Sequence, residues 1–178
     1  PSSITSIGAC AFKNCSSLKQ ISIPSSVTSI GSCAFKNCSS LKQISIPSSV
    51  KKIGICAFYE CTSLTHISFE NHSLVDSFDD NTFSECSSLT QISIPSSVTL
   101  IGYSSFYNCT SLEQISFESN SSLYWIGHCA FIGCSSLKEI VIPSSVTFIG
   151  DSAFENCESL TQVAFERYSS LASFRYCI

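Results

Sequence analysis

The sequence predicts a β-dominated solenoid, a rod formed by stacking short coils of 23 residues on one another. Three observations support this prediction. Residues 1–23 and 24–46 are identical except at the pairs Ile4/Val27 and Ala9/Ser32. The same apolar positions return in every later copy, and proline and glycine return at fixed offsets in most copies. One such unit is too small to bury its own apolar face, so only stacked units form a core.

Seven full repeats and one partial repeat fill the chain. They cover 1–23, 24–46, 47–71, 72–94, 95–119, 120–142 and 143–167, with the partial repeat at 168–178. Repeats that end in phenylalanine carry two additional residues, as in Phe69-Glu70-Asn71, and no proline follows them. From the third repeat onward long and short junctions alternate, so we expect a structural unit of two repeats, 48 residues long. We expect the whole to be one solenoid, cut from a longer array.

Within the second repeat the elements follow in a fixed order. Residues 27–30 predict a short extended stretch, which Gly31 ends at a turn. Residues 32–38 predict one short helical or 3-10 turn. The Ile-Ser-Ile stretch at 44–46 alternates with a period of two and predicts a strand with both isoleucines facing the core. Pro47 ends this strand, because proline has no N–H to donate to a strand ladder.

Stacking gives the predicted shape. The strands at the ends of the repeats form a parallel sheet on a concave face, and the short extended stretches form a second row of strands. Neighbouring coils lie about 4.8 Å apart, the spacing of strands in a sheet, so eight coils give a rod roughly 40 Å long.

The repeat pattern I-P-S-S-V-T-x-I-G-x-x-A-F-x-x-C-x-S-L-x-x-I resembles the BspA-like, or Treponema pallidum type, leucine-rich repeat over essentially the whole chain. In the second repeat its fixed offsets are occupied by Gly31, Phe35, Cys38 and Leu41. The fourth repeat departs most, with Asp79 in place of glycine and a histidine in place of proline, so we expect a distorted turn there. The resemblance implies a leucine-rich-repeat solenoid of the α/β horseshoe class.

Members of this family occur on bacterial surfaces and in parasitic protists such as trichomonads and Entamoeba. The resemblance therefore implies a cell-surface or extracellular location and an adhesion function, with host or extracellular-matrix proteins such as fibronectin as the ligand class. The family has no catalytic residues. The alternative is an intracellular scaffolding or structural repeat protein, because abundant free thiols persist best in a reducing compartment.

Charge is scarce and unevenly distributed. Charged residues make up 12% of the chain, and the formal net charge is -4. Residues 1–52 contain six lysines and no acid, so the remaining chain carries -10, and an elongated fold has a positive and a negative end. Binding of nucleic acid requires a basic face, so we do not expect it as a partner. No apolar run of about 18 residues is present, and the sequence predicts no membrane span.

Cysteine is unusually frequent, with twelve copies. Seven share position 15 of the repeat: Cys15, Cys38, Cys61, Cys86, Cys109, Cys134 and Cys157. Four share position 10, namely Cys10, Cys33, Cys56 and Cys129, and Cys177 continues that row. Disulfides and a metal site are the functional alternatives. We favour an internal structural ladder without metal or cofactor. Only three histidines are present, and a disulfide between side chains that point the same way is strained.

Two surfaces are candidates for binding. Position 20 provides an outward stripe on the concave face: Gln20, Gln43, His66, Gln91, Gln114, Glu139 and Gln162. Position 6 is polar in the early repeats and becomes Leu100, Trp125 and Phe148 in three successive repeats, with Tyr124 adjacent. We expect these four residues to form an exposed contact patch for a protein ligand or for self-association, since exposed apolar rows mark contacts. The alternatives are a solubilising amide ladder and side chains that lie flat on the second sheet.

Catalysis is not expected. The chain contains no nucleophile elbow, zinc-protease motif, P-loop or dinucleotide fingerprint. Asp76, Asp79, Asp80 and Asn81 form an acidic cluster, which lacks the spacing of a calcium-binding loop and is expected to be a solvated turn. The sequence therefore predicts a non-enzymatic interaction module.

Overall fold

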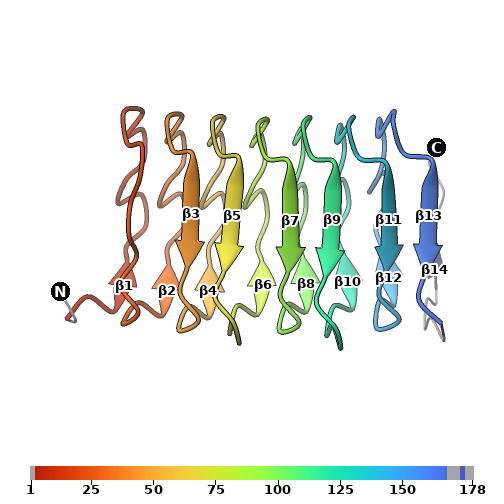
Figure 1. The fold of residues 1–178 in the computed structure, drawn as a ribbon, viewed down its shortest axis with the longest axis horizontal. Coiled ribbons are helices and arrows are strands. Elements are labelled where there is room, and N and C mark those ends of the chain that lie inside the picture. Colours follow the sequence, from red (N-terminus) through yellow and green to blue (C-terminus); the bar gives the residue numbers. More distant parts are fainter. Residues whose placement is uncertain (1–2, 168–172, 175–178) are drawn as a thin grey trace.

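The structure, a computed structural model, describes residues 3–167 and 173–174. It is a stack of coils with two parallel sheets on its sides, which confirms the predicted parallel-strand solenoid. The coils in Figure 1 follow one another in a nearly straight row, with the N-terminal end and the C-terminal end at opposite ends of the rod. The lysine-rich first coils and the acidic later coils therefore lie toward opposite ends.

Each coil contributes one strand to each sheet. The short-strand sheet contains, in order, β1 (Ser6–Ile7), β2 (Ser29–Ile30), β4 (Lys52–Ile53), β6 (Ser77–Phe78), β8 (Leu100–Ile101), β10 (Trp125–Ile126), β12 (Phe148–Ile149) and β14 (Ser173–Phe174). The long-strand sheet contains β3 (Gln43–Ile46), β5 (His66–Phe69), β7 (Gln91–Ile94), β9 (Gln114–Phe117), β11 (Glu139–Ile142) and β13 (Gln162–Phe165). The coils at the two ends differ: residues 20–23 of the first coil join neither sheet, and of the partial eighth coil the structure describes only β14.

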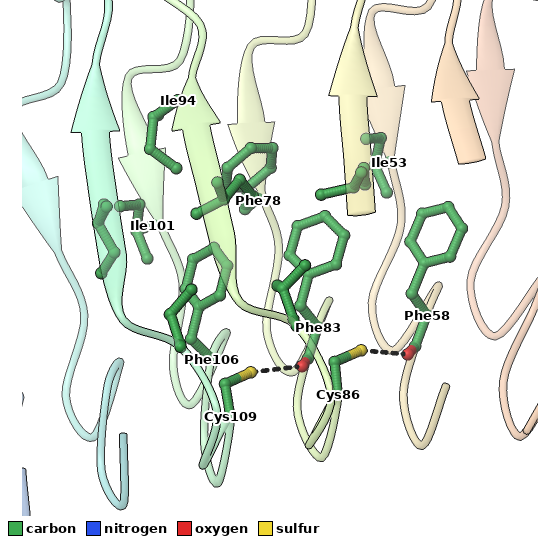
Figure 2. Close-up of a cluster of buried hydrophobic side chains, with 14 of the residues drawn as sticks. Ile53, Phe58, Phe78, Phe83, Cys86, Ile94, Ile101, Phe106 and Cys109 are labelled. Carbon is green, nitrogen blue, oxygen red and sulfur yellow. Dashed lines mark hydrogen bonds between the residues drawn. The ribbon is translucent and has the colours of Figure 1, made fainter. Parts of the chain in front are cut away.

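The core is a set of apolar columns between the two sheets. In β3 the exposed Gln43 and Ser45 alternate with the buried Ile44 and Ile46, as predicted. The phenylalanines at position 12 stack along the rod, with ring centroids of Phe35 and Phe58 5.3 Å apart and nearly parallel at 4°. Figure 2 shows Phe58, Phe83 and Phe106 in this column. Burial of such a ring contributes about 1.5–3 kcal/mol, and aromatic pairing adds about 0.5–1.5 kcal/mol.

The predicted helical turn at residues 32–38 is wrong. No helix occurs in residues 3–167 or 173–174, and this segment consists of consecutive turns. Cys33 and Asn37 have left-handed backbones, with φ of 57° and 60°. The N–H groups consequently alternate in direction: Ala34 donates to Gly31 O in its own coil at 3.2 Å, and Phe35 donates to Ala57 O in the next coil at 2.8 Å. A helix keeps its N–H groups within one segment, whereas this conformation uses half of them to join coils.

Glycine at position 8 allows close approach between coils. A Cβ on Gly150 would lie 2.4 Å from the backbone nitrogen of His128, so a side chain there requires the backbone to shift. The irregular fourth coil has Asp79 at this position. There β4 and β6 pair at one residue only, Ile53↔Phe78, whereas β2 and β4 pair at two. The coil that carries Asp79 therefore has the shortest strand pairing in the short-strand sheet.

Coils associate in pairs along the long-strand sheet. The strands of β3 and β5, of β7 and β9, and of β11 and β13 each pair over four residues. Between these pairs, β5 meets β7 and β9 meets β11 at a single residue position. The tight pairs cover residues 24–71, 72–119 and 120–167, the same 48-residue units that the alternating junctions indicate.

The glutamate of each long junction joins the two coils of a pair. The Glu70 N–H donates to Ile46 O at 3.0 Å, and its Oε2 accepts from the Ser48 N–H at 3.1 Å. Glu118 and Glu166 repeat both contacts in the following pairs. The two residues inserted after each phenylalanine therefore provide a two-point clamp onto the preceding turn.

Candidate interaction surfaces

In three consecutive coils the residue at position 6 changes from polar to apolar, and these side chains form a continuous apolar ridge on the short-strand sheet. Strand register places Trp125 between Leu100 and Phe148. The rings of Trp125 and Phe148 stack with centroids 3.8 Å apart at 15°. Each of these three residues points away from the core but is half-buried, because each side chain lies against its neighbour. We call Leu100, Tyr124, Trp125 and Phe148 the aromatic ridge.

Polar groups border the aromatic ridge. Tyr124 is 47% exposed and lines, with Leu100, a hollow of about 320 Å³ that also contains Lys52, Asp76 and Asp79. On the other side His128 contacts the Phe148 ring edge-on, with centroids 5.8 Å apart. The structure therefore brings together an apolar strip and both signs of charge, an arrangement suited to a protein partner.

The long-strand sheet presents the predicted polar stripe. All seven residues at position 20 are exposed, and the serines at position 22 lie beside them. The stripe includes an open hollow of about 610 Å³ at its N-terminal end and one of about 520 Å³ across β5, β7 and β9. Toward the C-terminal end the serine row is replaced by Val141, which is 51% exposed. The repeat pattern predicted this outward face. The hollows could not be predicted, because each depends on the side chains of three adjacent coils.

From Cys38 to Cys157 the cysteines at position 15 belong to the core and are hydrogen-bonded, whereas Cys15 in the first coil is exposed. The Cys38 thiol donates to Phe12 O of the preceding coil at 3.1 Å. Five more thiols make the same contact at 3.2 Å, namely Cys61, Cys86, Cys109, Cys134 and Cys157. Figure 2 shows two of these bonds, from Cys86 to Phe58 and from Cys109 to Phe83. Each carbonyl also accepts the backbone N–H of the cysteine in its own coil, so the row links consecutive coils.

Burial makes these thiols poor nucleophiles and poor metal ligands. Desolvation raises the pKa of Cys38 to about 11, of Cys86 to about 12 and of Cys157 to about 11. It also raises the pKa of Cys109 and Cys134 well above the ordinary value. Reactivity requires the thiolate, which these groups do not form near neutral pH.

The cysteines at position 10 have a different role in the fold. Cys33, Cys56 and Cys129 lie at left-handed positions of the outer turns and are half-buried. Asn81 and Ser104, which replace cysteine in other repeats, have the same backbone conformation. Cys177 lies outside the described residues. The sequence analysis missed these turns, although asparagine recurs at position 14, where Asn14, Asn37, Asn108 and Asn156 are also left-handed.

The acidic cluster of the fourth coil is divided between separate contacts. The Ser77 hydroxyl lies 3.0 Å from Asp76 Oδ1 and 3.1 Å from Asp79 Oδ1. The Asp80 carboxylate accepts the N–H of Tyr103 in the next coil at 2.8 Å. Within the described part of the chain, no three histidine, cysteine or carboxylate side chains are grouped so as to hold a metal ion. No helix of that part is long and apolar enough to cross a membrane.

The model of the BspA type leucine rich repeat region matches residues 1–78 and 72–178, with six copies of the repeat. The chain belongs to this family. The fold of this family is generally a non-enzymatic interaction scaffold. No curated protein matches the chain.

Solved structures agree with this assignment. A leucine-rich repeat protein from Bacteroides ovatus superposes with a TM-score of 0.78 and 33% identity, over 93% of this chain and 48% of that one. The pneumococcal vaccine antigen PcpA gives 0.68 and 28%, over 93% of this chain and 37% of its own. The Treponema pallidum leucine rich repeat protein gives 0.62 and 27%, over 77% and 75%. The chain spans less than half of the first two proteins.

Proposed function

We propose that this chain is a surface-exposed or extracellular adhesion module that binds a host or extracellular-matrix protein through the aromatic ridge. The observation that carries the proposal is the stacked pair of Trp125 and Phe148 in a row that is polar in the first four coils. Interfaces concentrate their binding energy in aromatic residues surrounded by polar groups. The similarity to a protein used as a vaccine antigen supports the surface location.

The position of the ridge within the repeat is the second argument. The same outward position is Ser6, Ser29, Lys52 and Ser77 in the four preceding coils, so the short-strand sheet does not need apolar side chains there. Three apolar residues in consecutive coils cost solubility without filling the core. Contact with a protein partner removes that cost. Self-association through the same ridge is the second partner class.

The other candidate function is an intracellular scaffolding repeat protein. It is favoured by the cysteines, since those in residues 3–167 are held as free thiols and such thiols persist in reducing compartments. Under either function the row at position 15 is a structural cysteine ladder, and no catalytic residue is assigned.

A binding measurement with a paired variant tests the adhesion function. The double substitution Trp125→Ser/Phe148→Ser is expected to weaken binding to immobilised fibronectin at least about tenfold, because it removes the aromatic contacts. Leu74→Ser is the matched control, since it removes a side chain that is 51% exposed elsewhere on the rod. Surface plasmon resonance gives the affinity, and circular dichroism checks that both variants keep the fold.

Two results would contradict the proposal. Binding that is unchanged in the double variant means that the ridge is not the contact surface. A wild-type chain that binds neither fibronectin nor other immobilised matrix proteins means that matrix adhesion is the wrong function, and a simultaneous loss of dimers in the double variant would then assign the ridge to self-association.

A further inference from the structure

The N-terminal hollow of the long-strand face is a polar cavity open to solvent. Its volume is about 610 Å³. The side chains around it come from three consecutive coils and share hydroxyl, amide and imidazole groups; they are Gln20, Ser22, Gln43, Ser45, His66 and Ser68. Ile21 and Ile44 also line the hollow, but Ile44 is buried and Ile21 half-buried, so most of the exposed groups are polar.

Most of these polar groups have no partner within the described protein. The amides of Gln20 and Gln43 and the hydroxyls of all three serines make no hydrogen bond to another residue of 3–167. His66 is the exception, because its Nδ1 lies 2.9 Å from the hydroxyl of Thr65. The row therefore does not form a closed amide ladder, and its donors and acceptors are available to a ligand.

Two lysines directly precede residues that line this hollow. Lys19 and Lys42 immediately precede Gln20 and Gln43, and a backbone hydrogen bond of 3.4 Å from Lys42 N to Lys19 O places them side by side. Both side chains are exposed and neither forms an ion pair in the described structure. The chain has no acid before Glu60, so the first two coils contain no carboxylate side chain that could neutralise the two ammonium groups.

The C-terminal half of the same face lacks this property. There Lys138 is paired with Glu113 at 2.8 Å, and Glu118 and Glu139 add negative charge beside the same glutamine row. Compared with this half of the face, the N-terminal hollow combines unpaired hydroxyl and amide groups with neighbouring lysines that form no ion pair in the described structure.

We propose that the N-terminal hollow binds an anionic polysaccharide, that is, a sulfated or carboxylated glycan chain. Sugar hydroxyls match the serine and glutamine groups, and acidic substituents match Lys19 and Lys42. Nucleic acid fits less well, since no phenylalanine, tyrosine or tryptophan lines the hollow to stack on bases. A membrane surface would need an apolar or aromatic group to enter the lipid. This site is separate from the aromatic ridge, which lies on the other sheet, so the two proposals stand or fall independently.

Calorimetry with a heparin-derived octasaccharide tests the site directly. Lys19→Gln/Lys42→Gln is expected to weaken binding about tenfold or more, whereas Lys51→Gln/Lys52→Gln, with the same change of net charge on the other sheet, weakens it less than about twofold. Gln43→Ala is expected to weaken binding severalfold, and Gln114→Ala, the equivalent change in the acidic half, to leave it unchanged. Wild-type affinity falls as sodium chloride rises from about 0.05 M to about 0.5 M.

Several outcomes overturn the proposal. Equal losses in the two lysine pairs show general charge attraction without a site. Equal binding of the fully desulfated, N-acetylated and carboxyl-reduced octasaccharide shows that negative charge is not recognised. Binding to phosphatidylserine vesicles or to single-stranded DNA, with no binding of the octasaccharide, assigns the lysines to a different polyanion.

Discussion

Phe106→Ala destabilises the rod by about 4 kcal/mol, as expected for truncation of a fully buried phenylalanine. Phe106 is 0% exposed. Its ring stacks on Phe83 and Phe131, with centroids 5.3 Å and 5.2 Å away, and meets Phe78 edge-on at 6.0 Å. The substitution therefore leaves a cavity in the centre of the column and removes three aromatic contacts. Urea unfolding followed by circular dichroism measures the loss.

Tyr103→Ala is the control for this experiment, because Tyr103 lies in the same coil and is 51% exposed. We expect it to change the free energy of unfolding by no more than about 0.5 kcal/mol. If the two variants lose the same stability, the phenylalanine column is not the core of the rod.

Alkaline pH destabilises the protein steeply through the thiol row. Burial raises the folded-state pKa of these thiols, to about 12 for Cys86 and well above the ordinary value for Cys109 and Cys134. Since the unfolded thiol titrates near 8.5, their stabilising contribution is complete below that pH and is lost as pH rises toward the folded-state pKa. Each such group loses about 1.4 kcal/mol per pH unit, so these three thiols together lose about 4 kcal/mol between pH 9 and 10.

The measurement is the urea midpoint at pH 7.5, 9, 9.5 and 10 in the presence of a reductant. Cys109→Ala is expected to lower the free energy of unfolding at pH 7.5. Above pH 9 it is expected to reduce the loss of that free energy by about 1.4 kcal/mol per pH unit, the contribution of one thiol. A variant that keeps the full wild-type slope would show that the loss comes from other groups.

The repeating part of the fold could be predicted from sequence, because every coil buries apolar side chains at the same repeat positions. The alternation at Ile44 and Ile46 identified the strand and its buried face. The phenylalanine at position 12 and the cysteine at position 15 identified the interior columns. The alternating junctions also indicated the 48-residue pairs, although the clamp made by Glu70 depends on the approach of two coils in space.

The outer turn could not be predicted, because its conformation depends on contacts between coils. Residues 32–38 have a composition that suits a helical turn, but the neighbouring coil offers carbonyls to Cys33, Phe35 and Asn37 at 2.7–2.9 Å. Those bonds outweigh the cost of two left-handed residues, which is about 1–3 kcal/mol each. The candidate sites divide in the same manner. The aromatic ridge could be predicted because position 6 changes from polar to apolar residues in the sequence. Its partial burial could not be predicted, because it results from stacking between side chains of neighbouring coils.

We infer that the buried repeating residues, cysteines included, build the rod and leave binding to side chains that face outward. Thiol titration of the unreduced protein tests it most directly, because cysteine is the repeating residue with the greatest capacity for other chemistry. We expect all twelve thiols to react in denaturant without reductant, while in the native state the buried thiols from Cys38 to Cys157 stay unreactive. Fewer than about eight free thiols in denaturant would contradict the claim, since the cysteines would then be a disulfide framework.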